Sequence, residues 1–254
     1  MRQRSRARST AACAVLACLA AGCDGGDGIC EAPLSADRTP VREARLPSAW
    51  WQGNADSFRI LVTPRPYRVT DHALEQLRIV MTEQAGLRIE IAEGEDTGLP
   101  AIGTLDYADI IKIAHMQMPT DAKPTIVLVV VENSNCPDAT YGFAECEYVP
   151  RPAAVIALHR GPLGAISIGP ISPETMEATV VVHEVGHWLG VPARDFHTSA
   201  VDGLHCTNAR CVMFKGSRAG ACAIVANLSS GLPVRFCPDC AEELAELRRR
   251  TVAP

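Results

Sequence analysis

Residues 125–131, with the sequence TIVLVVV, constrain the fold more than any other segment of the chain. A strand with one face in water alternates apolar and polar side chains, whereas a strand covered on both faces is apolar throughout. This segment shows no alternation. We therefore predict a central strand with other elements packed on both of its faces.

Three further segments have strand character. Residues 58–62 form a compact apolar run with β-branched side chains, and residues 153–158 form a second short apolar run. Residues 87–92 (LRIEIA) alternate apolar and polar positions, which is the period of a half-buried strand. Together with 125–131, these segments predict a sheet.

Helical patterns lie between these strands. Apolar residues recur at helical spacing after Thr70 or Asp71, either of which can cap a helix that ends at Gly86. The same spacing predicts a second helix over 104–117. Alternating strands and helices predict an α/β (α+β) domain with a mixed, twisted sheet.

A further helix has unusually clear boundaries. Ser172 offers a capping hydroxyl, Pro173 suits the first helical position, and Glu174 complements the positive end of the helix dipole. Gly190 is a natural stop.

This helix carries an HExxH motif, made of His183, Glu184 and His187. Residues four apart lie on one face of a helix, so both imidazoles can bind one Zn²⁺. Zinc lowers the pKa of a bound water towards neutrality, and a neighbouring carboxylate can accept its proton. We predict His183 and His187 as zinc ligands and Glu184 as the general base.

The sequence after this helix resembles that of a known family. Gly190 follows His187 by three residues, where metzincin metalloproteases break the helix to bring round a third ligand, although their usual ligand position is occupied here by Ala193. Further on come a histidine joined to a cysteine, a second cysteine, a methionine and a distal CxxC pair: His205, Cys206, Cys211, Met213, Cys237 and Cys240. This pattern resembles that of the archaemetzincins.

The resemblance implies a metzincin-like zincin fold over about residues 57–250, with two packing helices, an active-site helix and an irregular C-terminal subdomain. It implies that His205 is the third zinc ligand and that Met213 forms the Met-turn beneath the site. It implies that strand 153–158 is an edge strand lining the cleft, where an extended peptide could pair. A second, structural zinc would be held by Cys206, Cys211, Cys237 and Cys240.

The chain departs from the family by an insertion. Fourteen residues, 191–204, separate Gly190 from His205, where the family has two. The insertion brings His197 as an alternative third ligand, and Asp195 and Asp202 as oxygen alternatives. The phrase HEVGHWLG also resembles the pappalysin-type metzincins, but Met213 lies closer to the helix than their Met-turn does.

The chain contains eleven cysteines, an unusual number for a cytosolic protein of 254 residues. Disulfides can form if the chain is exported. In that case we expect a bridge between Cys136 and Cys146, which enclose a short loop. An oxidising compartment also leaves an alternative to the structural zinc, in which Cys206 pairs with Cys211 and Cys237 with Cys240.

The N-terminus has the features of an export signal. Four arginines precede a short apolar run over 11–21, too short to span a bilayer, and the exit at Gly22-Cys23 resembles a bacterial lipoprotein box. We predict a signal peptide over 1–22, lipidation at Cys23, and a flexible tether over 23–56. The alternative is an ordinary cleaved signal with incidental cysteines.

The charge balance limits the partners. Acidic residues outnumber basic ones 29 to 24, which argues against nucleic-acid binding. We therefore expect an exported zinc metallopeptidase of the bacterial cell envelope, monomeric, held to the membrane only by its lipid and acting on peptides or proteins. The alternative is a non-catalytic zinc-binding or interaction lipoprotein that retains the fold.

Overall fold

The computed structural model describes residues 57–63, 68–94, 104–117, 123–131, 133–134, 142–145, 153–159, 172–200, 203–208, 210–214 and 234–252. The predicted signal peptide 1–22, Cys23, the tether 23–56, and the disulfide candidates Cys136 and Cys146 lie outside the described residues.

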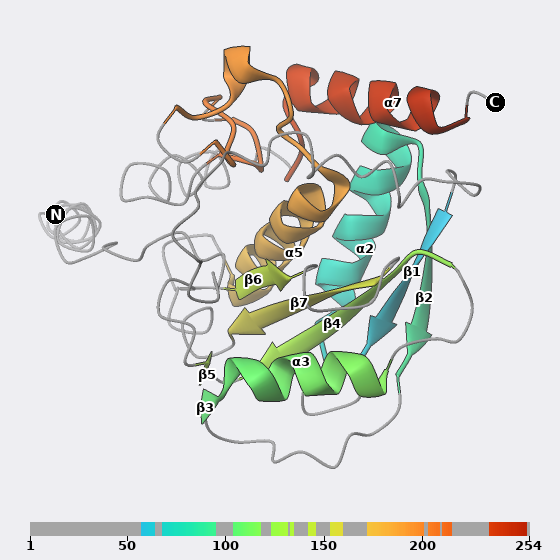
Figure 1. Cartoon of the computed structure of the whole chain (residues 1–254), viewed down its shortest axis with the longest axis vertical. Helices are drawn as coiled ribbons and strands as arrows, with labels where there is room; N and C mark the ends of the chain where they lie inside the picture. The colour runs from blue at the N-terminus through green and yellow to red at the C-terminus, as the bar shows by residue number, and fades with distance from the viewer. Residues whose placement is uncertain are drawn as a thin grey trace, which may run out of the picture.

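A five-stranded sheet in the order β2-β1-β4-β7-β6 forms the centre of the molecule (Figure 1). Its first four strands are parallel, and β6 runs antiparallel to β7. The strands are β1 (Ser57–Val62), β2 (Arg88–Glu93), β4 (Thr125–Val131), β6 (Gly142–Glu145) and β7 (Ala153–His159). This arrangement confirms the predicted α/β class with a mixed sheet.

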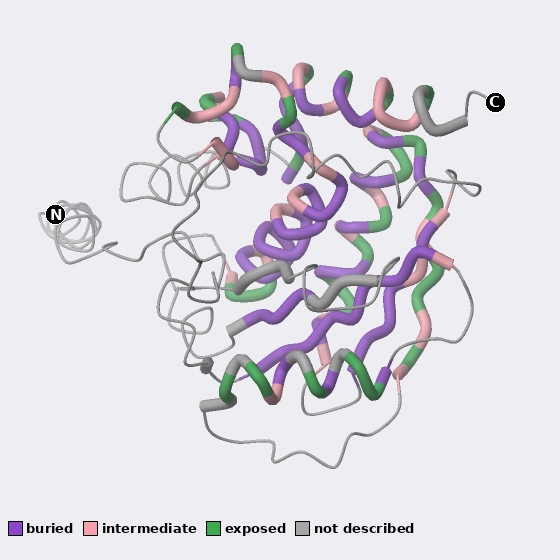
Figure 2. The backbone as a smooth tube through the Cα atoms, viewed as in Figure 1, coloured by how far each residue is buried: buried purple, intermediate pink, exposed green. Residues whose placement is uncertain are grey.

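The central strand β4 is covered on both faces, as its composition predicts. Every residue of β4 is buried (Figure 2). Ile126, Leu128 and Val130 belong to the core that also includes α2 (Asp71–Val80) and α5 (Pro173–Leu189). Helix α3 (Tyr107–Met116) lies across the opposite face of the sheet (Figure 1).

Helix α3 is shorter than predicted because its expected first turn is a strand. Thr104 and Leu105 form β3 (Thr104–Leu105), which pairs with β5 (Asn133–Ser134) as a separate two-stranded sheet. The helix therefore begins at Tyr107 rather than at 104.

The boundaries of α2 follow its capping residues. The Thr70 side chain accepts a hydrogen bond from the Ala73 amide at 3.3 Å, so Thr70 is the N-cap. The helix continues as a π-helical turn, η2 (Met81–Ala85), and ends at Gly86, whose φ of 63° is left-handed. The predicted end of this helix is thus confirmed.

Helix α5 begins and ends as predicted. The Ser172 hydroxyl accepts the Thr175 amide at 3.2 Å, and Gly190 closes the helix with a φ of 89°. The helix is buried on most sides, and the buried Glu177 carboxylate accepts the Thr70 amide at 2.6 Å, joining α5 to the start of α2.

One expectation about the edge of the sheet is wrong. Strand β7 is not an edge strand, because it pairs with β4 on one side and with β6 on the other. Within the described residues, the outer strand on this side is β6, a four-residue strand that the sequence analysis did not predict.

The C-terminal region is also less irregular than expected, because it contains a long helix, α7 (Pro238–Val252). Pro238 suits its first position, and the following residues are mostly alanine, glutamate, leucine and arginine, which all favour helix. In the part of the chain that the structure describes, no helix combines the length and apolarity needed to cross a membrane.

Candidate metal centres

Three histidines converge beside helix α5. The ligating atoms of His183, His187 and His205 all lie within 4.8 Å of one another. The Nε2 atoms of His183 and His187 are 3.1 Å apart. We call this group the three-histidine site.

The helix and one carbonyl orient the first two imidazoles. His183 and His187 stand one turn apart on α5, as the motif predicts. His183 Nδ1 lies 2.7 Å from the carbonyl oxygen of Val212, which fixes the proton on Nδ1 and turns the Nε2 lone pair towards the other histidines. This is the outer partner that a metal-ligating histidine usually has.

The loop after the insertion brings in His205. The adjacent Cys206 donates its amide to the Met213 carbonyl at 2.8 Å, and the His205 carbonyl accepts the Ser199 amide at 2.6 Å. His205 is itself buried, and its ring stacks on that of His183 with a centroid distance of 5.2 Å. A local turn between 197 and 206 therefore returns the chain to α5 after the inserted residues.

Met213 packs against helix α5. Its side chain is fully buried, and a Cβ added at Gly186 would come within 2.3 Å of its Sδ. Only a glycine at this helical position allows so close an approach, so Gly186 and Met213 together form the floor of the three-histidine site.

The electrostatics of the site favour a neutral His183. Its pKa is lowered from 6.5 to about 4, mainly by burial and also by the neighbouring His205, while the Val212 hydrogen bond opposes the shift. A neutral imidazole keeps the lone pair that a metal needs. Glu184, next to His183 on α5, is buried at 9% exposure.

The three-histidine site fits zinc. Tetrahedral coordination at zinc–nitrogen distances of about 2.0–2.1 Å places two nitrogens about 3.3 Å apart. The observed 3.1 Å between the Nε2 atoms of His183 and His187 is close to this value. The site has three imidazoles, a lone pair set by an outer carbonyl, and a carboxylate on the same helix.

Four cysteines form a second cluster, and one of them, Cys206, directly follows His205 in the chain. Cys206 Sγ lies 3.7 Å from Cys237 Sγ, and Cys211 Sγ lies 3.6 Å from Cys240 Sγ. We call this group the cysteine cluster. All of its members are buried and none is in a disulfide.

The alternative disulfides are not formed. The short distances join Cys206 to Cys237 and Cys211 to Cys240, whereas the alternative paired Cys206 with Cys211 and Cys237 with Cys240. The loop that carries Cys206 and Cys211 therefore lies against the start of α7, where Cys237 and Cys240 are found.

Sulfur contacts make some of these thiols acidic. The pKa of Cys206 is lowered to about 6, first by its contact with Cys211, and the pKa of Cys237 is lowered by its contact with Cys206. The same contacts raise the pKa values of Cys211 and Cys240. The sulfur contacts thus favour the thiolate form at Cys206 and Cys237 and the thiol form at Cys211 and Cys240.

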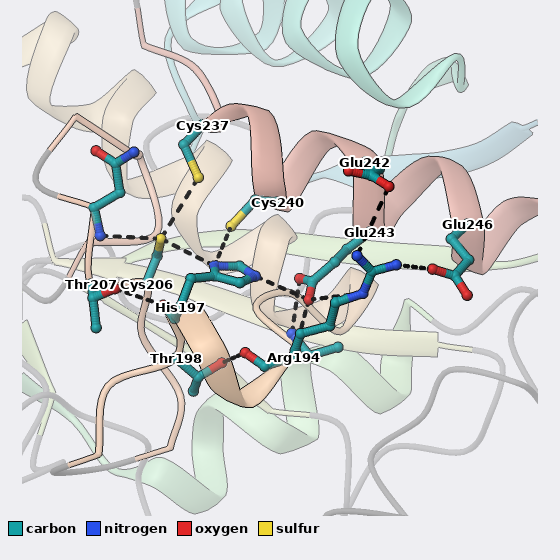
Figure 3. Close-up of polar contacts among 12 residues, drawn as sticks. Arg194, His197, Thr198, Cys206, Thr207, Cys237, Cys240, Glu242, Glu243 and Glu246 are labelled. Atoms are coloured by element: carbon teal, nitrogen blue, oxygen red, sulfur yellow. Dashed lines mark hydrogen bonds and ion pairs between the residues drawn. The ribbon is translucent and has the colours of Figure 1, made fainter.

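The structure places His197 against the cysteine cluster and not in the three-histidine site. Its Nδ1 lies 3.4 Å from Cys206 Sγ and 4.0 Å from Cys240 Sγ (Figure 3). Asp202 and the side chain of Asp195, the oxygen alternatives, lie outside what the structure describes.

Sequence reasoning missed Glu243, which anchors the inserted segment. This buried carboxylate on α7 accepts the amides of Ala193 and Arg194 at 2.9 and 2.6 Å (Figure 3). Arg194 also forms ion pairs with Glu242 and Glu246. Nothing local distinguishes Glu243 from those two acids; only its three-residue distance from Cys240 could have drawn attention to it.

The chain is similar to solved structures of metal-dependent peptidases. The archaemetzincin from Methanopyrus kandleri matches with a TM-score of 0.49 and 17% identity, over 78% of this chain and 98% of that one. A zinc-dependent peptidase from Methanocorpusculum labreanum matches with a TM-score of 0.45 and 14% identity, over 74% of this chain and 99% of that one. Metalloproteinase-II from Bacteroides fragilis matches with a TM-score of 0.43 and 13% identity, over 77% of this chain and 54% of that one.

No protein-family model and no curated protein matches the chain. The name of the first of these solved structures is that of the family which the cysteine and histidine pattern resembles.

Proposed function

We propose that this chain is a zinc-dependent peptidase. The observation that carries the proposal is the convergence of His183, His187 and His205, three histidines from two separated segments, beside the helix that also carries Glu184. Structural histidines do not need ligating atoms within 4.8 Å of one another, whereas a metal centre does.

When bound by these three histidines, zinc would supply a water of lowered pKa and polarise the scissile carbonyl. The chain itself orients the groups that would hold the metal. The Val212 carbonyl fixes the tautomer of His183, and the close contact of Gly186 with Met213 sets the distance between α5 and the loop that carries Met213.

Glu184 is the proposed general base. It follows His183 on α5 and is buried at 9% exposure, so its carboxylate works in a medium of lower dielectric than water. It would accept the proton of the attacking water and pass it to the leaving amine. A purely structural metal site needs the histidines but not this carboxylate.

Strand β6 is the proposed support for an extended substrate. It lies beside α5, and within the described residues it pairs with β7 alone. A peptide strand could add to its other side through main-chain hydrogen bonds, which require no particular side chains. We therefore assign to β6 the pairing with an extended peptide that was expected of strand 153–158.

We further propose that the cysteine cluster holds a second, structural zinc. The sulfur–sulfur distances of 3.6 and 3.7 Å are close to the edge length of a tetrahedron of sulfurs around zinc at about 2.3 Å. A metal there would hold the start of α7 to the loop that carries His205.

Export and a lipid anchor at Cys23 complete the proposal. They are supported by the arginine-rich start, the short apolar run over 11–21 and the Gly22-Cys23 exit. Incorporation of radiolabelled palmitate in a bacterial host tests this step. Label should appear in the wild type and be lost in Cys23→Ala, and label that persists in the variant contradicts lipidation at this residue.

Peptide hydrolysis by the zinc-loaded protein tests the main proposal. Glu184→Gln should lower kcat/KM on cleaved members of a peptide library by at least about 100-fold while zinc content stays unchanged. Glu174→Gln, an exposed change in the first turn of the same helix, is the matched control and should retain activity. Activity that survives in Glu184→Gln would rule out the mechanism.

A further inference from the structure

The second cluster contains one donor more than zinc takes. Four cysteine sulfurs and His197 Nδ1 gather at the junction of the inserted segment and α7. Structural zinc sites are almost always four-coordinate. One of these five donors must therefore stay outside the coordination shell.

His197 is positioned as a ligand. It ends a short 3-10 turn, η3 (Asp195–His197), inside the insertion, and its side chain is buried at 4% exposure. Tetrahedral zinc with one nitrogen and three sulfur ligands gives nitrogen–sulfur distances of about 3.5 Å. The observed distances from Nδ1 are 3.4 Å to Cys206 Sγ and 4.0 Å to Cys240 Sγ.

The donor set is also mutually close. The ligating atoms of His197, Cys206, Cys237 and Cys240 all lie within 4.8 Å of one another, and all four residues are buried. Figure 3 shows the Nδ1 edge of the ring turned towards Cys206 and Cys240, with a dashed line from Cys206 to Cys237.

Glu243 occupies the place of an outer partner on the far edge of the ring. Its Oε1 lies 3.0 Å from His197 Nε2, and its own side chain is 2% exposed. The alignment is poorer than that of a hydrogen bond, since Nε2 has no partner of good hydrogen-bond geometry. The nearby carboxylate nevertheless favours a proton on Nε2, which leaves the lone pair of Nδ1 facing the sulfurs.

Without a metal, Nδ1 can share a proton with Cys206 Sγ, which lies 3.4 Å away. A metal bound between the ring and the sulfurs would make Nδ1 a ligand. The resulting arrangement of carboxylate, histidine and metal is the one in which a metal-bound histidine is usually found.

Cys211 accepts two backbone amides, whereas Cys206 accepts one, from Asn208 at 3.4 Å. Cys211 Sγ accepts the backbone amides of Met213 at 3.4 Å and Cys237 at 3.3 Å. These two amides would stabilise the sulfur beside the metal while Cys206, Cys237 and Cys240 bind it.

We propose that His197, Cys206, Cys237 and Cys240 hold the second zinc, with Glu243 orienting His197. The inserted segment then supplies a ligand to the structural metal, and His205 and Cys206, adjacent in the chain, join one metal each. This inference rests on the second metal of the proposed function, but it is independent of peptidase activity.

Cobalt substitution of the full chain tests the proposal. Only thiolate ligands give intense near-ultraviolet charge-transfer bands with Co²⁺, so the three-histidine site contributes none of them. Cys211→Ser should keep these bands at wild-type intensity, and Cys237→Ser should lower them. Bands weakened equally by both changes would overturn the assignment in favour of four cysteines.

The ¹¹³Cd chemical shift of the unmodified chain is a second measurement, and it needs no variant. With ¹¹³Cd²⁺ in place of zinc, the resonance of the cysteine cluster should fall in the range of three sulfurs and one nitrogen, and a four-sulfur shift would overturn the proposal. Glu243→Gln should weaken metal affinity at this site about 10–100-fold, as is typical of outer partners. Unchanged affinity would remove Glu243 from its proposed role.

These outcomes are separable from those of the main proposal. If no peptide is cleaved but the cobalt bands and the cadmium shift are as expected, the peptidase fails and the second site stands. If peptides are cleaved but the cysteine cluster binds no metal, the second site fails alone.

Discussion

Gly186→Ala tests how closely helix α5 packs against the Met213 side chain. An added Cβ would lie 2.3 Å from Met213 Sδ, 3.2 Å from its Cε and 3.0 Å from Phe236 Cε1. Met213 and Phe236 are themselves 0% and 1% exposed, so neither can swing into solvent. The helix and the loop must therefore separate.

The expected cost follows from two opposing effects. Overpacking a filled core costs about 1–3 kcal/mol. Alanine is favoured over glycine inside a helix by about 0.5–1 kcal/mol. The net loss should be about 1–2 kcal/mol, or a Tm about 2–8 °C lower for a domain of this size. Because Met213 follows Val212, whose carbonyl orients His183, zinc affinity should fall as well.

Thermal and urea denaturation of a double-mutant cycle provide the assay. Met213→Ala alone should cost about 2–5 kcal/mol through the cavity it leaves. In that background Gly186→Ala should cost less, because the two Met213 atoms are gone and only Phe236 Cε1, at 3.0 Å, remains. Stabilisation by Gly186→Ala in the wild type, or an equal loss in both backgrounds, would refute the close contact.

Three further changes test other parts of the structure. Ser172→Ala removes the cap of α5 and should cost about 1 kcal/mol in urea denaturation, and an unchanged midpoint would contradict the capping bond. Gln84→Ala removes two bonds to the backbone of Phe236, of 2.9 and 3.2 Å, and should cost about 1–3 kcal/mol, whereas a neutral result would show that water replaces them. Because the pKa of His183 is lowered from 6.5 to about 4, the unfolded chain takes up its proton first. The metal-free protein should therefore lose up to about 3 kcal/mol as pH falls from 6.5 to 4, and His183→Gln should remove that part of the pH dependence.

The parts of the fold that the sequence predicted well have local signals. The apolar run of β4 and the boundaries of α5 depend on neighbouring residues: Ser172 caps its own helix, and Gly190 ends it. The HExxH spacing likewise places His183 and His187 on one helical face without reference to the rest of the chain.

The errors concern partners distant in sequence. Thr104 and Leu105 fit a helical pattern, but a strand 29 positions later pairs with them. The edge position of β6 follows from the order of strands in the sheet, which no single segment encodes. Helix α7 is different, because Pro238 and the helix-forming residues after it are local signals for a helix.

At the metal centres, too, sequence-based prediction fails where the partners are distant in the chain. Spacing alone left His197 and His205 as competing ligands of one metal. The structure separates them by folding the insertion back, with bonds from Ser199 to His205 and from Thr207 to His197. Glu243, which holds the insertion, comes from a helix some fifty residues away.

Anomalous scattering at the zinc edge from crystals of the zinc-loaded protein tests the central claim most directly. We expect a zinc peak within coordination distance of His183, His187 and His205 at once, with Glu184 beside it. Zinc confined to the cysteine cluster, or a peak beside α5 that lacks His205, would contradict the proposed catalytic centre.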